Sequence, residues 1–455
     1  MRWIARRSDW SALLMGLSVA IAVGSPAVAN DFFGDLNTTA AAPAATQSPW
    51  RLLGWAQHKT AYGYRDPEPG FSRAAADITR FESSLYGQGS VRFGDWSARL
   101  AGSLEHDWLP DAENAGLWSG YAFTGEQAEA RQWQWLWADS YLSWQSGDWW
   151  LQGGYQTLAW GQAESIAVLD VLAPRDQRWP GQVDLEQMRL PVPALTLNWR
   201  GQLDLVVLDG TQSDRLAAPF DEFDTLAELR ATGSEIVEQT PANHLGYALR
   251  WQQRWSGVDV QVMAAQLNSY TPSLRAVTMG GMGPERIELR QEPVQVLGGG
   301  VQWVRGAWLW RTEQAWHRGG QLPTSQALEP WVDVDEWRSM MGVEYSGWSN
   351  LTLSAEVGAL YLLRNADTVD ADEWRWSQSV RTRWTGWNDR LALTLQAVGL
   401  PGDEGWLTRA EAEWKPNDPL SLSLSVVEYH AWRDEQALYA VRHNDAITLN
   451  LRFGF

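Results

Sequence analysis

The sequence predicts an all-β fold, a transmembrane antiparallel up-and-down β-barrel of about 16–18 strands. Three observations support this prediction. The chain opens with an export signal, apolar and polar residues alternate along most of its length, and short turns alternate with long polar connections. A period of two indicates strands, because successive side chains of a strand point to opposite faces.

The first 29 residues read as a secretory signal peptide. A basic start at Arg2, Arg6 and Arg7 precedes a short apolar stretch over 12–23, and Ala27-Val28-Ala29 then provides the small residues that a signal peptidase accepts. A membrane anchor is the alternative, but its apolar run is shorter than the roughly 20 residues that a spanning helix needs. We therefore expect cleavage after Ala29.

Composition excludes several classes of function. The formal net charge is −19, which argues against nucleic acid as a partner, because phosphate binding needs clustered Lys and Arg. The absence of cysteine excludes disulfides and thiolate metal sites. The chain is nevertheless 45% hydrophobic with 32 Trp, and no segment after the signal is apolar enough for a transmembrane helix. We expect no cofactor and no metal.

Residues 30–49, rich in Ala, Thr and Pro, are expected to form a loose periplasmic lead-in, and residues 50–455 the barrel. A repeated unit begins after the lead-in. Phe81, Leu85 and Phe93 share one face, Gly94-Asp95 turns the chain, and Trp96, Leu100 and Leu104 continue an apolar face. Pairs such as Gly-Asp favour tight hairpins, so this unit predicts two adjacent strands.

Long polar connections separate these hairpins. They are predicted near 61–77, 108–130, 160–192, 210–242, 271–284, 317–334, 364–373, 401–405 and 431–444. Short turns on one side and long loops on the other are typical of bacterial outer-membrane barrels, whose short turns are periplasmic. The pattern predicts about 18 strands, with both termini periplasmic.

Tryptophans gather where the predicted strands end. One group lies beside short turns and the other beside long loops: Trp96, Trp144, Trp149, Trp199, Trp255, Trp303, Trp308, Trp384 and Trp414, and then Trp133, Trp135, Trp316, Trp337, Trp374 and Trp406. Aromatic rings favour the membrane interfaces, so the two groups predict two girdles. A buried tryptophan core is the alternative, but it would not confine these residues to strand ends.

The last residues alternate without a break. Ile447, Leu449, Leu451, Phe453 and Phe455 share one face, and the chain ends on an aromatic residue. We expect Phe455 to be the signal by which the outer-membrane assembly machinery recognises this barrel.

The face opposite the apolar rows carries charge. The expected lumen-lining residues are Arg99, Arg250, Arg254, Arg375, Arg381, Arg383, Arg409, Glu411 and Arg452. A charge facing lipid costs roughly 2–4 kcal/mol at mid-membrane, so these side chains belong in a hydrated interior. They predict a conducting lumen whose charges set selectivity. In the alternative, they pair with one another and plug a closed barrel.

The connection at 160–192 is too apolar at Ile166–Leu172 to hang in water. We expect Ser165–Leu172 to form a short helix or strand folded into the barrel, since long loops with structure of their own are usually functional. The expected constriction or gate comprises Trp160, Glu164, Asp170, Arg175, Asp176 and Arg178. An extracellular cap held by its own hydrophobic residues is the alternative.

This connection carries a resemblance. Trp160-Gly161-Gln162-Ala163-Glu164 and Asp170-Val171-Leu172-Ala173-Pro174-Arg175-Asp176, after an upstream Gly154-Tyr155-Gln156 strand, resemble a signature of proteobacterial outer-membrane porin-like proteins, broadly similar to alginate-export-type barrels. The signature reads W-G-x-[AS]-[DE] and then D-V-x-x-P-x-D. The resemblance spans about 40 residues and implies a barrel more than a cargo. Ala173 replaces an expected Asn, so a role of that side chain does not carry over.

An outer-membrane surface hydrolase acting on lipid or protein is the competing function. It needs a nucleophile beside a base. The histidines are His58, His106, His244, His317, His430 and His443, and no spacing links any of them to a particular serine and carboxylate. We therefore expect no catalytic residues and no enzyme.

Two further alternatives are weaker. A soluble β-propeller predicts a fixed repeat of about 40–50 residues, whereas the loops here vary widely. The acidic clusters Asp221–Asp224 and Asp333–Glu336 lack the ordered oxygen spacing of a calcium loop, so we expect solvated acidic faces.

The sequence thus predicts a channel or porin-like barrel in a Gram-negative outer membrane, passing an unidentified solute. Its expected partners are outer-membrane lipid, lipopolysaccharide, the assembly machinery and an inner-membrane exporter.

Overall fold

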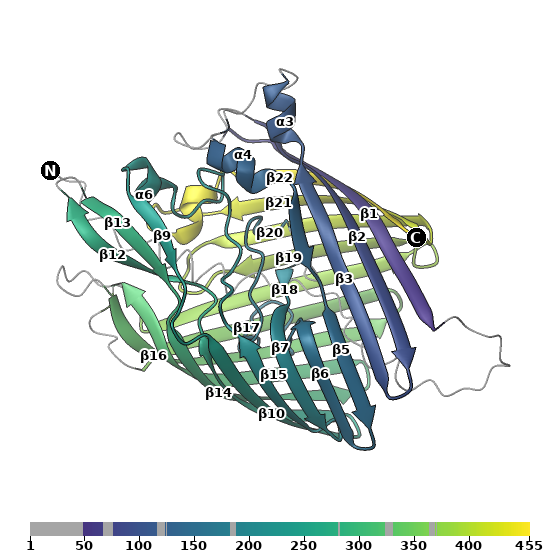
Figure 1. Ribbon diagram of the computed structural model, residues 1–455. Helices are drawn as coiled ribbons and strands as arrows, with labels where there is room; N and C mark the ends of the chain where they lie inside the picture. The colour runs from purple at the N-terminus through teal and green to yellow at the C-terminus, as the bar shows by residue number, and fades with distance from the viewer. Residues whose placement is uncertain are drawn as a thin grey trace.

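A computed structural model describes residues 49–66, 76–115, 123, 125–182, 188–280, 283–323, 331–363, 369 and 371–455. Within them the chain forms a closed antiparallel barrel (Figure 1). Strand β1 pairs with β2 on one side and with β22 on the other, so the barrel sheet closes on itself. The predicted signal peptide and nearly all of the predicted lead-in lie outside the described residues.

The barrel has 18 strands when β4 and β5, which both pair with β3, are counted as one interrupted strand. This confirms the predicted fold class. The strands are β1 (Trp50–Gly63), β2 (Asp77–Phe93), β3 (Trp96–Asp107), β4 (Gln134–Trp137), β5 (Ser140–Ser146), β6 (Trp149–Gln156), β7 (Val192–Trp199), β8 (Leu203–Asp209), β10 (Leu245–Trp255), β11 (Val258–Asn268), β14 (Pro293–Arg305), β15 (Trp308–Pro323), β16 (Trp331–Trp348), β17 (Leu351–Leu362), β18 (Trp374–Gly386), β19 (Leu391–Gly399), β20 (Trp406–Asn417), β21 (Leu420–His430) and β22 (Ala446–Gly454).

The two ends of the barrel differ. At the short-turn end, glycines at positive φ make the tight turns that hairpins need: Gly94 (62°), Gly147 (57°), Gly257 (77°) and Gly306 (62°). The opposite, long-loop end carries the remaining elements (Figure 1). These are α3 (Leu109–Asn114), α4 (Gly125–Arg131), α6 (Ala227–Ala231), η2 (Ala437–Val441) and a separate sheet of β9 (Glu235–Gln239), β12 (Ser273–Gly280) and β13 (Gly283–Arg290).

One predicted loop is shorter than expected. The connection predicted at 317–334 begins only after Pro323, because β15 continues past a register shift between Arg318 and Gly320. Gly319 there has a φ of 90°. A bulge interrupts the two-residue alternation, which explains why the sequence pattern placed the end of the strand too early.

The outward faces of the strands are apolar. Large exposed side chains follow one another around the barrel, among them Leu52, Leu85, Leu100, Leu195, Leu297, Val357, Leu395 and Leu449. Exposed tryptophans lie at the strand ends, as in Trp96, Trp255 and Trp308 at the short-turn end and Trp135, Trp337 and Trp374 at the long-loop end. An apolar band between aromatic girdles is the surface of a barrel that crosses a membrane.

No helix among the described residues is long and apolar enough to cross a membrane.

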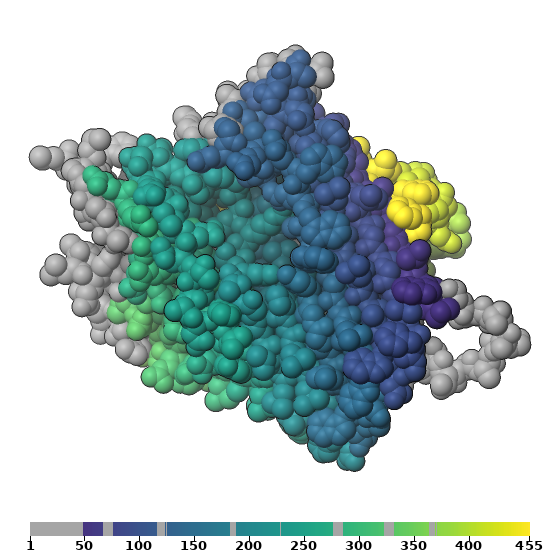
Figure 2. Space-filling model, viewed as in Figure 1, coloured from purple at the N-terminus to yellow at the C-terminus, as the bar shows by residue number. Residues whose placement is uncertain are grey.

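The interior is partly filled by chain. The face seen in Figure 2 is hollowed between its blue and teal sides, and chain is visible at the bottom of the hollow. Two apolar clusters include residues from the connection between β6 and β7 together with residues of the barrel wall.

The C-terminal residue closes the barrel beside β1. The backbone amides of Gly54 and Phe455 each donate to the other's carbonyl at 2.9 Å. A Cβ added at Gly54 would lie 2.5 Å from the Phe455 ring, so the ring lies directly over this glycine.

Deleting Phe455 should lower the yield of folded barrel in the outer membrane, because both the closing bonds and the aromatic terminus are lost. Heat-modifiable electrophoretic mobility and protease resistance of membrane fractions measure this. Phe455→Tyr, which keeps the ring and the backbone bonds, is the matched control. Normal insertion of the deletion variant would disprove the role of Phe455 as an assembly signal.

Candidate functional site

The connection between β6 and β7, described for residues 157–182 and 188–191 and called the loop below, enters the lumen and is anchored there by Glu356 of β17. The carboxylate of Glu356 accepts hydrogen bonds from the backbone amides of Glu164 (2.7 Å), Ser165 (2.8 Å) and Ile166 (3.0 Å). Glu356 is only 3% exposed. Three amides converging on one carboxylate fix the backbone of the loop, because an ionised acceptor forms stronger hydrogen bonds than a neutral one.

Glu313 of β15 makes a second anchor of the same kind. Its carboxylate accepts from the amides of Gln162, Ala163 (3.2 Å) and Leu169 (3.1 Å). Glu313 is fully buried. The two carboxylates thus satisfy six amides of a segment that has no regular secondary structure.

Side chains of the loop add polar contacts to the wall. Glu164 pairs with Arg311 of β15 at 2.6 Å and accepts from the hydroxyl of Ser354 at 3.0 Å. The Ser165 hydroxyl accepts from Ser379 of β18 at 2.8 Å and from Gln396 of β19 at 3.1 Å. The loop is therefore bound to four strands, β15 and β17 to β19.

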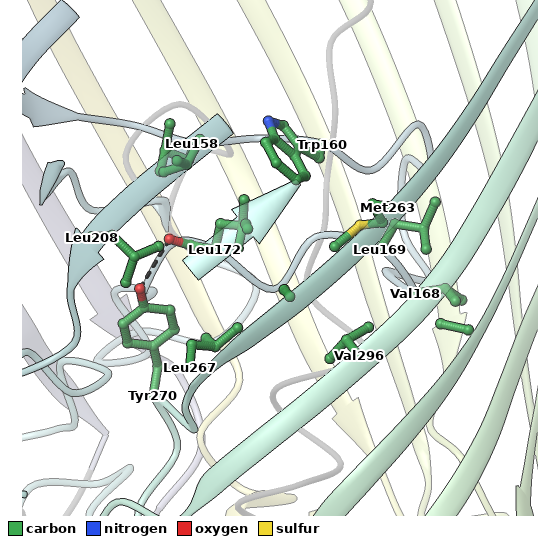
Figure 3. Close-up of a cluster of buried hydrophobic side chains, with 14 of the residues drawn as sticks. Leu158, Trp160, Val168, Leu169, Leu172, Leu208, Met263, Leu267, Tyr270 and Val296 are labelled. Carbon is green, nitrogen blue, oxygen red and sulfur yellow. Dashed lines mark hydrogen bonds between the residues drawn. The ribbon is translucent and has the colours of Figure 1, made fainter. Parts of the chain in front are cut away.

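The apolar residues of the loop pack on an apolar patch of the inner wall (Figure 3). Leu169 and Leu172 lie against wall residues such as Leu208, Met263 and Val296. The hydroxyl of Tyr270 donates to the carbonyl of Leu172 at 3.0 Å, the dashed line in Figure 3. The loop residues of this cluster are Leu158, Trp160, Ile166, Val168, Leu169 and Leu172.

Glycines of the wall make room for this packing. A Cβ at Gly298 of β14 would lie 2.5 Å from Leu169, and a Cβ at Gly358 of β17 would lie 2.5 Å from Ile166. The wall is thus shaped to the loop at two positions where a larger residue would displace it.

The second half of the loop crosses to another part of the wall. Trp179 packs in a cluster with Phe223 and with wall residues of β19 to β21. The guanidinium groups of Arg80 and Arg131 each lie 5.2 Å from the Trp179 ring. The Tyr429 hydroxyl of β21 donates to the carbonyl of Pro180. The loop therefore spans the lumen between separate parts of the wall.

Two ion-pair clusters lie on the loop. Asp170 pairs with Arg189 (2.9 Å) and Arg175 (3.3 Å). Asp176 pairs with Arg178 at 2.7 Å and with Arg215 at 3.2 Å, and both arginines also reach Glu105 of β3.

Burial alone would raise the pKa of Asp176, but the Arg178 guanidinium, followed by Arg215, holds it well below its usual range. The second cluster therefore remains ionised at neutral pH and joins the loop both to the wall and to the connection of residues 210–244.

All six residues expected to form the constriction lie on this loop inside the barrel. Trp160, Glu164, Asp170 and Asp176 are at most 9% exposed, and Arg250 lies 4.7 Å from the Trp160 ring. The short helix or strand expected at Ser165–Leu172 is absent, because the amides there bond wall carboxylates instead of backbone carbonyls. The loop contacts inward-facing residues of the barrel wall, whereas an external cap held by its own hydrophobic residues would not.

The expected lumen-lining residues lie on the strand faces opposite the exposed apolar rows. Several already have partners inside. Arg250 pairs with Asp204 (2.7 Å), Arg375 with Glu336 (3.3 Å), Arg254 with Asp259 (3.6 Å) and Arg409 with Glu411. Arg381 lies 3.8 Å from Glu164, and Arg383 lines a small cavity together with both of these residues. Arg99 lies 5.6 Å from the Tyr141 ring, and Arg452 lies 4.5 Å from the Trp55 ring.

Sequence reasoning missed the wall residues that hold the loop. Glu313 and Glu356 resemble any other polar inward position of a strand. A signal did exist for the apolar patch. Val206, Val207 and Leu208 are consecutive in β8, so both faces of that strand are apolar, which indicates that its inner face is covered.

Most acidic residues of the two clusters at Asp221–Asp224 and Asp333–Glu336 are buried, so the expectation of solvated acidic faces is wrong for them. Asp221, Glu222 and Asp224 are at most 5% exposed, because Asp221 pairs with Arg131 at 2.6 Å and Asp224 accepts backbone amides at both ends of a turn. Burial raises the pKa of both aspartates. Glu336 is likewise buried, between Arg338 and Arg375.

His58, which lies beside a serine, does not show the contacts of a hydrolase base. His58 hydrogen-bonds Ser83 at 3.0 Å, but its other nitrogen meets the Thr60 hydroxyl at 3.2 Å instead of a carboxylate. The structure as described contains no group of three or more His, Cys, Asp and Glu side chains that could hold a metal ion.

Glu356→Gln should weaken docking of the loop by roughly 1.5–3 kcal/mol, because an amide oxygen replaces a charged acceptor of three N–H groups. Trypsin should then cleave the folded barrel after Arg175 or Arg178, which mass spectrometry detects. Glu344→Gln is the control, since Glu344 contacts Arg311 but bonds none of the six loop amides. Equal protection of the two variants would contradict the anchoring role.

Acid should loosen the second ion-pair cluster. A carboxyl whose pKa is lowered by folding contributes stability above its unfolded pKa of about 3.9, and this contribution is lost as the pH falls further. Cleavage of the loop by a protease that is active at both about pH 3 and pH 6, with the fragments identified by mass spectrometry, measures this loosening. Asp176→Asn should remove part of the acid response, whereas Asp148→Asn, in an exposed pair at a short turn, should not. An unchanged response of Asp176→Asn would contradict this assignment.

A scan of protein-family models finds no match to the chain, and a search of curated proteins finds none either. Solved structures do match. Acinetobacter baumannii OccAB3 is 12% identical with a TM-score of 0.52, over 89% of this chain and 99% of that one. Pseudomonas aeruginosa OccK8 (OprE) is 9% identical with a TM-score of 0.50, over 90% and 99%. At this level of identity the chain is similar to these proteins in its barrel fold.

Proposed function

We propose that this protein is an outer-membrane channel that passes a polar solute, with the described part of the loop between β6 and β7 as its constriction or gate. One observation carries the proposal. A buried loop, bound through six amides to Glu313 and Glu356, narrows a closed barrel whose remaining inner wall is polar and charged. A structured loop within a barrel lumen sets the size and charge of what can pass.

The passage is displaced toward the strands that the loop leaves uncovered. Tyr86, Arg99, Tyr141 and Arg452 face inward from β2, β3, β5 and β22, and all are half-buried. On the opposite wall, Met263 and Ala315 are covered by the loop. A path beside the arginines would be hydrated and would favour polar solutes.

The location follows from the same proposal. The apolar outer band with its aromatic girdles and the similarity in barrel fold to OccAB3 and OccK8 (OprE) support an outer-membrane location. Cleavage after Ala29, contact with lipopolysaccharide, recognition by the assembly machinery and cooperation with an inner-membrane exporter belong to this proposal. So does the resemblance of Trp160–Asp176 to the signature of porin-like barrels.

Planar-bilayer conductance of the purified protein across a salt gradient tests the proposal. Discrete current steps are expected, and the reversal potential tells whether arginines or carboxylates govern ion preference. Absence of current from well-folded protein would overturn the channel function.

Replacing Asp170, Arg175 and Asp176 together by alanine should change the conductance or the ion preference, because the loop loses charges at the narrowest part of the lumen. Arg200→Ala, in an exposed pair at a short turn, is the control. If the triple variant conducts like the unmodified protein, the loop is not the constriction.

A further inference from the structure

A cavity of about 180 Å³ lies on the long-loop side of the loop. The loop contributes Ala167, Asp170 and Arg175 to its lining, and strands β11 and β14 to β16 contribute much of the rest. Pockets for drug-sized ligands are roughly 300–1,000 Å³, so this cavity suits a smaller molecule. A solute entering from the long loops would meet it before the loop.

Two buried acceptors of this cavity have no partner among the residues that the structure describes. Oδ1 of Asp170 and Nε2 of His317 make no hydrogen bond to these residues, although the two side chains are only 9% and 8% exposed. The His317 ring hydrogen-bonds the backbone of Val168, and because Nε2 is unbonded this bond uses Nδ1, which leaves Nε2 as the second nitrogen of the ring open to a ligand. Because an unpaired buried acceptor costs about 1–3 kcal/mol, the two atoms point to a ligand that donates hydrogen bonds.

Other parts of the lining narrow the class of ligand. Arg338 of β16 and Arg175 of the loop line the cavity together with Asp214, Glu292 and Glu336, and Leu267, Val294 and Val296 give it an apolar side. Arg338 pairs with Glu336 and Arg175 with Asp170, so the lining presents paired charges of both signs, and a ligand with a net charge of either sign meets a like charge there. A hydroxyl group both donates and accepts, so a ring bearing several hydroxyls can satisfy the acceptors, the guanidinium groups and the apolar side together.

We propose that this cavity, with Asp170 on its floor and His317 on its wall, is a binding site for a neutral polyhydroxylated solute of monosaccharide size. The inference rests on the proposed channel function and names the class of solute that the channel receives. Oδ2 of Asp170 meanwhile holds Arg175 and Arg189, so the site is built on the loop itself.

The test uses three probes with the same ring: D-glucose, D-glucosamine and D-glucuronate. Binding to the mature protein in a sugar-free zwitterionic detergent is followed by ligand-observed NMR titration, and single-channel currents are recorded in parallel. We expect D-glucose to bind most tightly and to interrupt the current when added on the long-loop side. Asp170→Asn and His317→Phe should each weaken glucose binding about tenfold, the effect of losing one buried hydrogen bond.

Two more variants separate binding from folding. Ala167→Leu leaves both acceptors in place but fills the cavity, so it should also weaken glucose binding. The control is Glu413→Gln. Glu413 lies on β20, whose residues do not line the cavity, so this variant should bind glucose as tightly as the unmodified protein.

Tighter binding of glucosamine or glucuronate would overturn the proposed solute class. Glucose binding that survives Asp170→Asn, His317→Phe and Ala167→Leu would overturn the site. Because NMR titration needs no conduction, binding that these variants abolish in a protein without current would uphold the site while the channel function fails.

Discussion

The interior of this barrel depends on one kind of interaction, the capture of backbone amides by buried wall carboxylates. A loop without helix or sheet hydrogen bonds cannot be buried unless its N–H groups find acceptors elsewhere. Glu313 and Glu356 supply them from two strands of the wall. Once the backbone is fixed, Leu169 can pack over Gly298, and Asp170 is held where it lines the outer cavity.

The barrel wall therefore has three environments instead of two. Its outer face is apolar throughout the membrane, and part of its inner face is polar and half-buried. The remaining inner face is apolar because the loop covers it, as Met263 and Ala315 illustrate. Hydrophobic burial thus serves the barrel twice, once toward lipid and once toward its own loop.

The sequence was informative wherever a local pattern determines the structure. Strand alternation and turns such as Gly94-Asp95 predicted the barrel, and the apolar run Ile166–Leu172 predicted a loop that leaves water. What it could not disclose were partners far along the chain. The amide of Glu164 bonds a residue 192 positions away, and no local pattern distinguishes Glu356 from another lumen carboxylate. The helix or strand expected at 165–172 failed for the same reason, since distant carboxylates replaced local hydrogen bonds.

These distant contacts also constrain the order of events during assembly. The loop begins at the end of β6, yet it forms hydrogen bonds with residues of β15, β17 and β21 that are 151, 192 and 249 positions away in the sequence. Early hairpins can pair while the loop has nothing to bind, because contacts of large sequence separation form late. The loop finds its full set of partners only when the last strands arrive. The internal obstruction can therefore be completed only when the wall that holds it is nearly complete.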